Sequence, residues 1–290
     1  MATLKDIKRR IESIKKTQQI TKAMKMVAAS KLRKSQRQLQ QTRPYARELS
    51  YALQLMASRN SIPDTPLFQQ RSDERRLYVA VSADKGLCGS FNANVFRQVE
   101  MEYENNKNRE LHLVVLGRKG CEHFRRQDYE MSGHCMDFFN QLDYNEAKKI
   151  ADYLLKLYKK NYTDRIYMIY TTFISSLQQK VVVEPFLPIS PPQHKDESES
   201  EYPPTAMLFQ PHPKTIFDKL APMSLNYGMY RILLESFTAE QGARMTAMET
   251  ASDNAQDMIR DLQLYYNKQR QATITKQLTE VVSSAEALRG

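Results

Sequence analysis

The chain has 290 residues, of which 41% are hydrophobic, and a formal net charge of +10. This length allows one or two domains with a sizeable core, and no run of 18 apolar residues is present, which excludes a membrane span. Residues 1–20 also lack the apolar core of a secretory signal. The three cysteines, Cys88, Cys121 and Cys135, have neither metal-ligand nor disulfide spacing, so we expect three reduced thiols.

The positive charge is concentrated at the N-terminus. Residues 1–58 contain fourteen Lys or Arg but three acids, which gives this segment a net charge of +11 and leaves the remainder near −1. Such a segment calls for an acidic partner, which could be nucleic acid, anionic lipid or an acidic protein surface. A basic, acid-poor N-terminus is also typical of a mitochondrial transit peptide.

Two long segments, residues 1–43 and 243–289, contain neither Gly nor Pro. As continuous helices they would be roughly 65 and 70 Å long. The second carries apolar or small residues at alternating spacings of three and four, the repeat of a coiled coil: Met245, Met248, Ser252, Ala255, Ile259, Leu262, Tyr266 and Gln269. We therefore expect an antiparallel pair of long helices; the alternative is two separate helices packed on a central domain.

The N-terminal segment starts with the same repeat, at Leu4, Ile7, Ile11 and Ile14. The next positions of the repeat are polar: Gln18, Thr21 and Lys25. We therefore expect this seam to break there, with an apolar stripe resuming in another phase at Ile20, Met24 and Val27.

The middle of the chain alternates between strand and helix patterns. Short apolar runs predict strands at 77–81, 111–116, 166–170 and 181–187, the last interrupted by Pro185. Helices are expected at about 91–105, 117–127 and 144–160, with Asp143 as a cap. The fold class predicted is a central Rossmann-like α/β domain with a mainly parallel sheet, plus a long antiparallel coiled coil of the N- and C-terminal helices.

Residues 190–204 are rich in Pro, Ser and acid and are expected to form a solvated connector. We predict four segments in chain order: an N-terminal coiled-coil helix at 1–58, an α/β domain at 75–190, an acidic, proline-containing linker at 191–206, and a C-terminal coiled-coil helix at 207–290.

No catalytic or cofactor motif stands out. The segment Asp84–Ser90 (DKGLCGS) follows the first strand, where a phosphate-binding turn would lie, but it matches neither glycine-rich phosphate motif. We interpret it as a tight turn made by two glycines, and Cys88 as a non-catalytic thiol. Asp253 and Asp257 lie one helical turn apart and are interpreted as a solvated face. We expect no cofactor and no metal; a site at His123 and His134 is disfavoured.

Four segments together resemble the gamma subunits of F-type ATP synthases of the bacterial type, in order from about residue 3 to the end. Residues 20–32 (ITKAMKMVAASKL), continued by Arg43-Pro44-Tyr45, resemble that family's N-terminal signature. The turn at 84–89 resembles its first strand-to-helix turn. Residues 243–248 with 251–255, and 262–275 (LQLYYNKQRQATIT), resemble its C-terminal motifs. Since the resemblance includes the basic N-terminus, we do not interpret that segment as a cleaved transit peptide.

The resemblance implies a non-catalytic rotor subunit. Its terminal helices would form a coiled coil inside a ring of alternating alpha and beta subunits, with the α/β domain below, beside an epsilon subunit and on the membrane rotor ring of c subunits. Ion flow would turn the shaft and catalysis would belong to the beta subunits. This places the chain peripherally on the cytoplasmic side of the cell inner membrane, with membrane contact only through the complex and no nucleic acid bound.

The resemblance also supplies expected interface and torque residues: Lys8, Arg9, Arg10, Met24, Lys25, Lys31, Arg33, Arg244, Arg270, Gln271, Thr275 and Gln277. Gln277 departs from the family pattern, where Glu is usual, as does Ser284-Ala285 where Gly-Ala is frequent. Met24 could face the ring or be a seam residue. From pattern alone, a basic coiled-coil adaptor for nucleic acid or anionic membrane is the alternative function; the basic helix lacks the aromatic interleaving of single-strand binders.

Overall fold

The computed structural model describes residues 3–58, 67–69, 71–127, 129, 131, 142–176, 178–189 and 212–287. It contains two compact units. The helical unit comprises Met1–Ala28 and Met245–Gly290, and the central unit comprises Ala29–Arg244. Both units draw on the two longest helices, α1 (Leu4–Ser58) and α5 (Pro213–Ala287).

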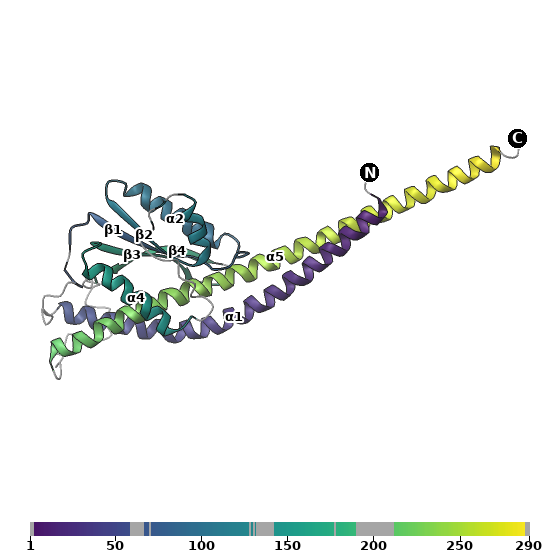
Figure 1. Cartoon of the computed structure of the whole chain (residues 1–290). Coiled ribbons are helices and arrows are strands. Elements are labelled where there is room, and N and C mark those ends of the chain that lie inside the picture. The colour runs from purple at the N-terminus through teal and green to yellow at the C-terminus, as the bar shows by residue number, and fades with distance from the viewer. Residues whose placement is uncertain are drawn as a thin grey trace. The chain divides into compact units, whose positions relative to one another are not determined.

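In the helical unit, the first part of α1 lies antiparallel to the second part of α5 (Figure 1). Ile7 and Ile11 of α1 pack with Ile259 of α5. Further along α1, Lys25 forms an ion pair of 2.6 Å with Glu249. Because residue numbers rise along α1 while those of its partners on α5 fall, the predicted antiparallel pairing is confirmed, and the alternative of separate helices is wrong for this unit.

The predicted seam of α5 is confirmed, with Met248, Ser252, Ala255 and Ile259 buried. The expected break in the α1 seam is wrong. The repeat continues in the same phase through residues that are buried or half-buried: Ile11, Ile14, Gln18, Thr21, Lys25, Ala28 and Leu32.

The polar members of the α1 seam find hydrogen-bond partners on α5 or within α1 itself, which explains why the phase holds. The amide of Gln18 donates to Oε1 of Gln256 at 2.7 Å and to the carbonyl of Ser252 at 3.4 Å. The hydroxyl of Thr21 donates to the carbonyl of Gln18 at 3.0 Å. The stripe expected in the other phase is largely in solvent, since Ile20 and Val27 are exposed.

In the central unit, four strands form one sheet in the order β2-β1-β3-β4. They are β1 (Arg75–Val81), β2 (Glu110–Leu116), β3 (Arg165–Phe173) and β4 (Gln179–Leu187). β1 pairs in parallel with both β2 and β3, while β4 is antiparallel to β3, so the prediction of a mainly parallel sheet is confirmed. Pro185 lies in the edge strand β4, close to a register shift, where the missing N–H is tolerated.

Helices cover both faces of the sheet (Figure 1). On one face, α2 (Phe91–Asn105) and α3 (Arg118–Arg125) pack on alternate residues of β1, including Tyr78 and Ala80. On the other face, α4 (Tyr144–Lys159) and parts of α1 and α5 pack on Leu77, Val79 and Val81. This alternation follows directly from the two-residue period of a strand.

The predicted helices in the middle of the chain are confirmed, with Asp143 as the cap of α4: its Oδ1 accepts from the N–H of Glu146 at 2.9 Å. The long helices extend further than the breaker-free segments, because α1 continues through Pro44 and α5 through Pro222. Both prolines lie where these helices pack on the central core. The connector predicted at 190–204 lies outside the described residues.

Two predictions about cysteines and glycines need correction. Cys88 is free, but Cys121 is disulfide-bonded, so the expectation of three reduced thiols is wrong. Spacing along a chain does not show which sulfurs a fold brings together. In the turn after β1, the left-handed residues are Leu87 (φ 61°) and Gly89 (φ 59°), so Gly89 uses the conformational freedom of glycine there and Gly86 does not.

Candidate subunit interface

The unpaired cations of α1 form the first part of a candidate interface. Five predicted site residues are exposed on this helix: Lys8, Arg9, Arg10, Lys31 and Arg33. Among the residues that the structure describes, none of the five forms an ion pair within the chain. Their charges are therefore available to an acidic partner surface.

Lys25 and Met24 differ from these cations. Lys25 lies on the seam, and its ion pair with Glu249 leaves the two side chains 39% and 49% exposed. Met24 is half-buried, next to the seam rather than on it. Its neighbours Met26 and Val27 are 71% and 57% exposed, so flexible apolar side chains reach the surface at this level of α1.

The second part of the candidate interface is the end of α5. The predicted residues Arg270, Gln271, Thr275 and Gln277 are all exposed. Several large apolar side chains on the same stretch are exposed as well: Leu264, Ile274, Leu278, Val281 and Val282. In the helical unit, α5 continues past the beginning of α1 (Figure 1). Exposed apolar groups in such number indicate a binding surface.

Arg244, also predicted as an interface residue, is 8% exposed in the structure. Its guanidinium forms an ion pair of 2.6 Å with Glu240, one helical turn away on α5. It also donates to the carbonyls of Lys85 and Gly86 in the turn after β1, at 3.0 and 3.2 Å. Arg244 therefore ties that turn to α5, a contact between distant parts of the sequence that no local pattern indicates.

The turn after β1 is where many α/β proteins bind phosphate through helix N-terminal amides. The helix after this turn is α2, whose N-cap residue Ser90 makes no side-chain cap hydrogen bond. The amides engaged within the chain are those of α3, which follows β2. At the start of α3, the N–H of Arg118 donates to Asp84 at 3.0 Å and the N–H of Gly120 to the hydroxyl of Ser82 at 2.9 Å. Gly117 packs so tightly that a Cβ would lie 2.1 Å from the carbonyl oxygen of Ser82. The start of α3 therefore has little room or donor capacity for a nucleotide phosphate.

Cys88 in the same turn is not an activated nucleophile. It is 2% exposed, and burial raises the pKa of its thiol despite the nearby charge of Arg244. The amide of Asn92 donates to its sulfur at 3.4 Å. A buried thiol with a raised pKa is protonated at neutral pH and therefore unreactive.

A buried carboxylate on α5 joins three elements. Glu235 is 3% exposed, and its carboxylate accepts two hydrogen bonds from Arg43 of α1, at 2.6 and 2.7 Å. It also accepts from the hydroxyl of Thr172 and from the N–H of Phe173, at the end of β3. Arg43 donates in addition to the carbonyl of Phe173 at 2.8 Å. Neither Glu235 nor Arg43 is among the site residues predicted from the sequence.

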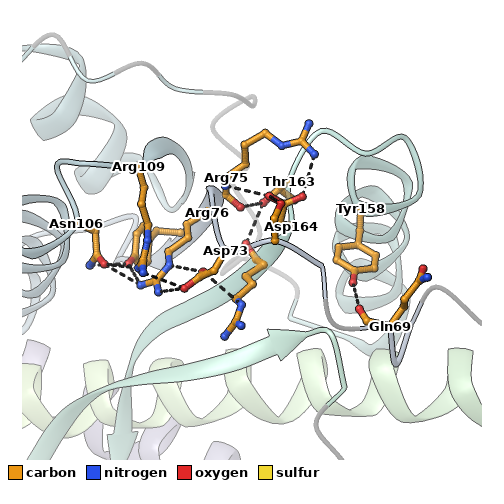
Figure 2. A network of polar contacts seen from close by, with 12 residues as sticks. Gln69, Asp73, Arg75, Arg76, Asn106, Arg109, Tyr158, Thr163 and Asp164 are labelled. Atoms are coloured by element: carbon orange, nitrogen blue, oxygen red, sulfur yellow. Dashed lines mark hydrogen bonds and ion pairs between the residues drawn. The ribbon is translucent and has the colours of Figure 1, made fainter.

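The amino ends of β1 and β3 carry a second charged network (Figure 2). Asp73 forms ion pairs with Arg76, Arg109 and Arg165, and the hydrogen bonds from Arg76 lower the pKa of its carboxyl. Asp164 is paired with Arg75. Burial opposes ionisation of Asp164, but hydrogen bonds from Arg75 and Ser72 prevail and lower its pKa. Each carboxylate here is held by arginines of the chain, which fits a structural role.

The described residues contain no group of three or more His, Cys, Asp or Glu that could hold a metal ion. Within the same residues, no helix is long and apolar enough to cross a membrane. Asp253 and Asp257 are exposed, in keeping with a solvated face.

Comparison with known proteins identifies the family. A family model described as ATP synthase matches residues 3–288. The ATP synthase gamma chain of Heliobacterium modesticaldum is 42% identical over 293 residues, which cover 99% of this chain and 100% of the relative. The chain belongs to the ATP synthase gamma chain family. The gamma chain of Chloroherpeton thalassium is 39% identical and is also matched over 99% of both chains.

Solved structures agree with this assignment to the gamma chain family. A chain in the central stalk and c-ring structure of the Tetrahymena thermophila mitochondrial ATP synthase is 26% identical, with a TM-score of 0.60; the match covers 80% of this chain and 99% of that one. A chain in an OSCP/F1/c-ring structure from Euglena gracilis has a TM-score of 0.65 at 21% identity, with 98% and 94% covered, and shows the shared fold.

Proposed function

We propose that this gamma chain is the non-catalytic rotor of the central stalk in an F-type ATP synthase. It couples ion flow through a membrane ring of c subunits to ATP synthesis at the beta subunits by rotating within a ring of alpha and beta subunits. An epsilon subunit accompanies it in the stalk. The chain lies peripherally on the cytoplasmic side of the inner membrane and meets the membrane through the complex.

The observation that carries this proposal is the outer surface of the antiparallel helix pair. It combines unpaired cations on α1, such as Arg9 and Arg10, with exposed apolar residues at the end of α5, such as Leu278 and Val281. An unaccompanied helix pair would leave both kinds of group in water. A surrounding protein ring with acidic loops would meet the cations, and its apolar lining would cover the end of α5.

The predicted contact residues belong to this surface. We propose that Lys8, Arg9, Arg10, Met24, Lys25, Lys31 and Arg33 face acidic loops of the ring. The end of α5 contributes Arg270, Gln271, Thr275 and Gln277 at the catalytic level. Arg244 acts differently: by holding the turn after β1 against α5, it positions that turn rather than contacting the ring with its own guanidinium.

A non-catalytic role is supported by the turn after β1, whose carbonyls at Lys85 and Gly86 accept from Arg244. At the start of α3, the N–H groups of Arg118 and Gly120 are likewise engaged, by Asp84 and Ser82. We expect the purified chain to bind ATP no more tightly than millimolar. Isothermal titration calorimetry measures this, and micromolar affinity would contradict a purely mechanical role.

Copurification tests the function as a whole. A tagged chain expressed with its cognate subunits is expected to bring down the nucleotide-binding subunits in a complex that survives 0.5 M salt, on the order of the ionic strength that screens exposed ion pairs. The basic adaptor alternative is not supported by the comparisons. It would instead give nucleic-acid or anionic-vesicle binding that falls steeply with salt, without those subunits.

A further inference from the structure

A cavity of about 470 Å³ lies in the central unit between α1, β4 and α5. Pocket volumes of this size accommodate a bulky side chain or a small molecule. Its walls come from three separate parts of the sequence: Arg43, Ala46, Arg47, Ser50, Tyr51 and Gln54 of α1; Glu184, Pro185, Phe186 and Ile189 of the β4 segment; and Ser224, Leu225, Gly228 and Arg231 of α5.

The cavity has an apolar floor and a polar rim. Ala46, Phe186 and Leu225 are between 5% and 8% exposed and supply aliphatic and aromatic surface. Two arginines of the wall are already neutralised, because Arg43 pairs with Glu235 and Arg231 with Glu184.

Arg47 differs from those two arginines. It is exposed and forms no ion pair with any described residue. Tyr51, one helical turn further along α1, is half-buried. The cavity therefore presents one unneutralised positive charge at its rim, above a floor that favours an apolar group.

Gly228 keeps the cavity open. Glycine inside a helix costs about 0.5–1 kcal/mol relative to alanine, and such a residue usually marks a close approach. Here a Cβ would meet just one neighbour, an edge carbon of Phe186 at 3.9 Å, which is ordinary contact. Packing within the described residues therefore does not require this glycine, and the space that it leaves belongs to the cavity.

We propose that this cavity receives an acidic segment of a partner polypeptide. One bulky apolar side chain of that segment packs on Phe186 and Leu225, and a neighbouring carboxylate binds Arg47. A polypeptide is favoured over a small molecule because the charged rim lies on the exposed side of α1, where a small ligand would remain largely in water, whereas a chain segment covers the opening itself.

The inference rests on the proposed function in one respect: the partner is expected to be another subunit of the assembly. The chemistry of the anchor, apolar with an adjacent acid, comes from the cavity alone. A buried apolar anchor next to a charged hydrogen bond is the arrangement that dominates the energy of many interfaces.

The test is site-specific photocrosslinking in the assembled complex. Tyr51 is replaced by the photoreactive analogue benzoylphenylalanine, the complex is purified and irradiated, and the adduct is sequenced by mass spectrometry. We expect a peptide of another subunit with Asp or Glu within three residues of a large apolar residue. Arg47→Glu is expected to lower the adduct yield at least tenfold, whereas Arg37→Glu, which reverses another exposed charge on α1, leaves it unchanged.

Two variants at Gly228 separate binding from folding. Gly228→Leu fills the cavity and is expected to abolish the adduct. Gly228→Ala is expected to raise the melting temperature and still reduce the yield, because the methyl group favours the helix but narrows the cavity. A drop in yield with a melting temperature at or above that of the wild type excludes misfolding as its cause.

Three outcomes overturn the proposal. The first is that no adduct forms in a complex that assembles, and the second is an adduct within this chain or with a lipid or small molecule. The third is a peptide adduct whose yield is unchanged by Arg47→Glu and Gly228→Leu. Failure of the unmodified chain to join any complex would instead contradict the proposed function. The two failures are therefore distinguishable.

Discussion

The central unit and the helical unit are each stabilised internally by different interactions. The central unit buries a continuous apolar core that includes Leu77, Leu154 and Leu233, each 0% exposed, and reinforces it with the ion pair between buried Glu235 and partly exposed Arg43. The helical unit has a narrow seam in which polar or small residues such as Thr21 and Ser252 alternate with a few large ones. The first pattern is that of a self-sufficient domain, and the second that of a structure which needs partners.

This difference follows from what each part must bury. A two-helix pair with Gln, Thr, Ser and Ala in its seam removes little apolar surface from water, so little free energy opposes its opening. The same unit exposes Ile20, Val27 and Leu278. From this contrast we expect the helical unit to fray in the isolated chain and to become rigid inside the proposed ring of subunits.

The largest expected effect comes from truncating the core of the central unit. Leu233→Ala should lower the free energy of unfolding by about 2–5 kcal/mol, since it leaves a cavity among fully buried neighbours. Urea denaturation measures this. Ile259→Ala, in the helical unit, should leave the main transition unmoved and speed hydrogen exchange near it. Equal loss of global stability in both variants would mean that the two units unfold as one.

A smaller loss of stability is expected when the ion pair between buried Glu235 and Arg43 is broken. Glu235→Gln removes the charge that accepts from Arg43, Thr172 and Phe173, and should cost about 1.5–3 kcal/mol. Glu249→Gln is the matched control, because the Glu249 side chain is 49% exposed whereas that of Glu235 is 4% exposed. Denaturation curves that place both variants within 0.5 kcal/mol, on the order of an exposed pair, would show that Glu235 has no special role.

The next effect depends on pH. Burial raises the pKa of Glu240 above the ordinary 4.5, although Arg244 opposes this; Asp84 raises it further and Lys31 lowers it. The native state therefore holds this proton more tightly than the unfolded chain does. That contribution to stability is fully present below pH 4.5 and is lost as pH rises through the native pKa.

Glu240→Gln cannot lose this proton, so the melting temperature of the variant should rise relative to wild type as pH increases from 4.5 towards neutrality. Parallel melting profiles for Glu240→Gln and wild type across this range would exclude a raised pKa for Glu240.

The smallest effect is expected at the Lys25–Glu249 pair of the helical unit. Because both side chains are more than a third exposed, a double-mutant cycle with Lys25→Ala and Glu249→Ala should give a coupling of about 0.2–1 kcal/mol that disappears at high salt. Protection from hydrogen exchange in the helical unit is the measurement. A coupling above 2 kcal/mol, of the order found for buried pairs, would place this pair in the same class as Glu235 and Arg43.

Much of the fold could be predicted from local pattern. The strands and helices of the α/β part lie within a few residues of where apolar runs placed them, and the α5 seam follows its spacing. The α1 seam could not be predicted from hydropathy, since Gln18 occupies it through hydrogen bonds to the partner helix and Thr21 through a hydrogen bond within α1. Hydropathy instead predicted a seam through Ile20 and Val27, but both side chains are exposed and do not pack within the chain.

The candidate site was accessible to sequence reasoning only in part. Exposed cations on α1 follow from composition and helical period. The contacts of Arg244 with Lys85 and of Glu235 with Phe173 join residues 159 and 62 positions apart, and no local signal indicates them. Arg43 belongs to the N-terminal signature, but its hydrogen bonds to Phe173 of β3 and Glu235 of α5 could not be predicted from the sequence.

Observation of single complexes tests the central claim, that this chain is a rotating shaft, most directly. The ring of alpha and beta subunits is immobilised and a probe is attached to the gamma chain through Lys107→Cys, an exposed position of the central unit. On addition of ATP the probe should rotate in one direction and stop when ATP is removed. A complex that contains this chain and hydrolyses ATP while the probe stays still would contradict the account.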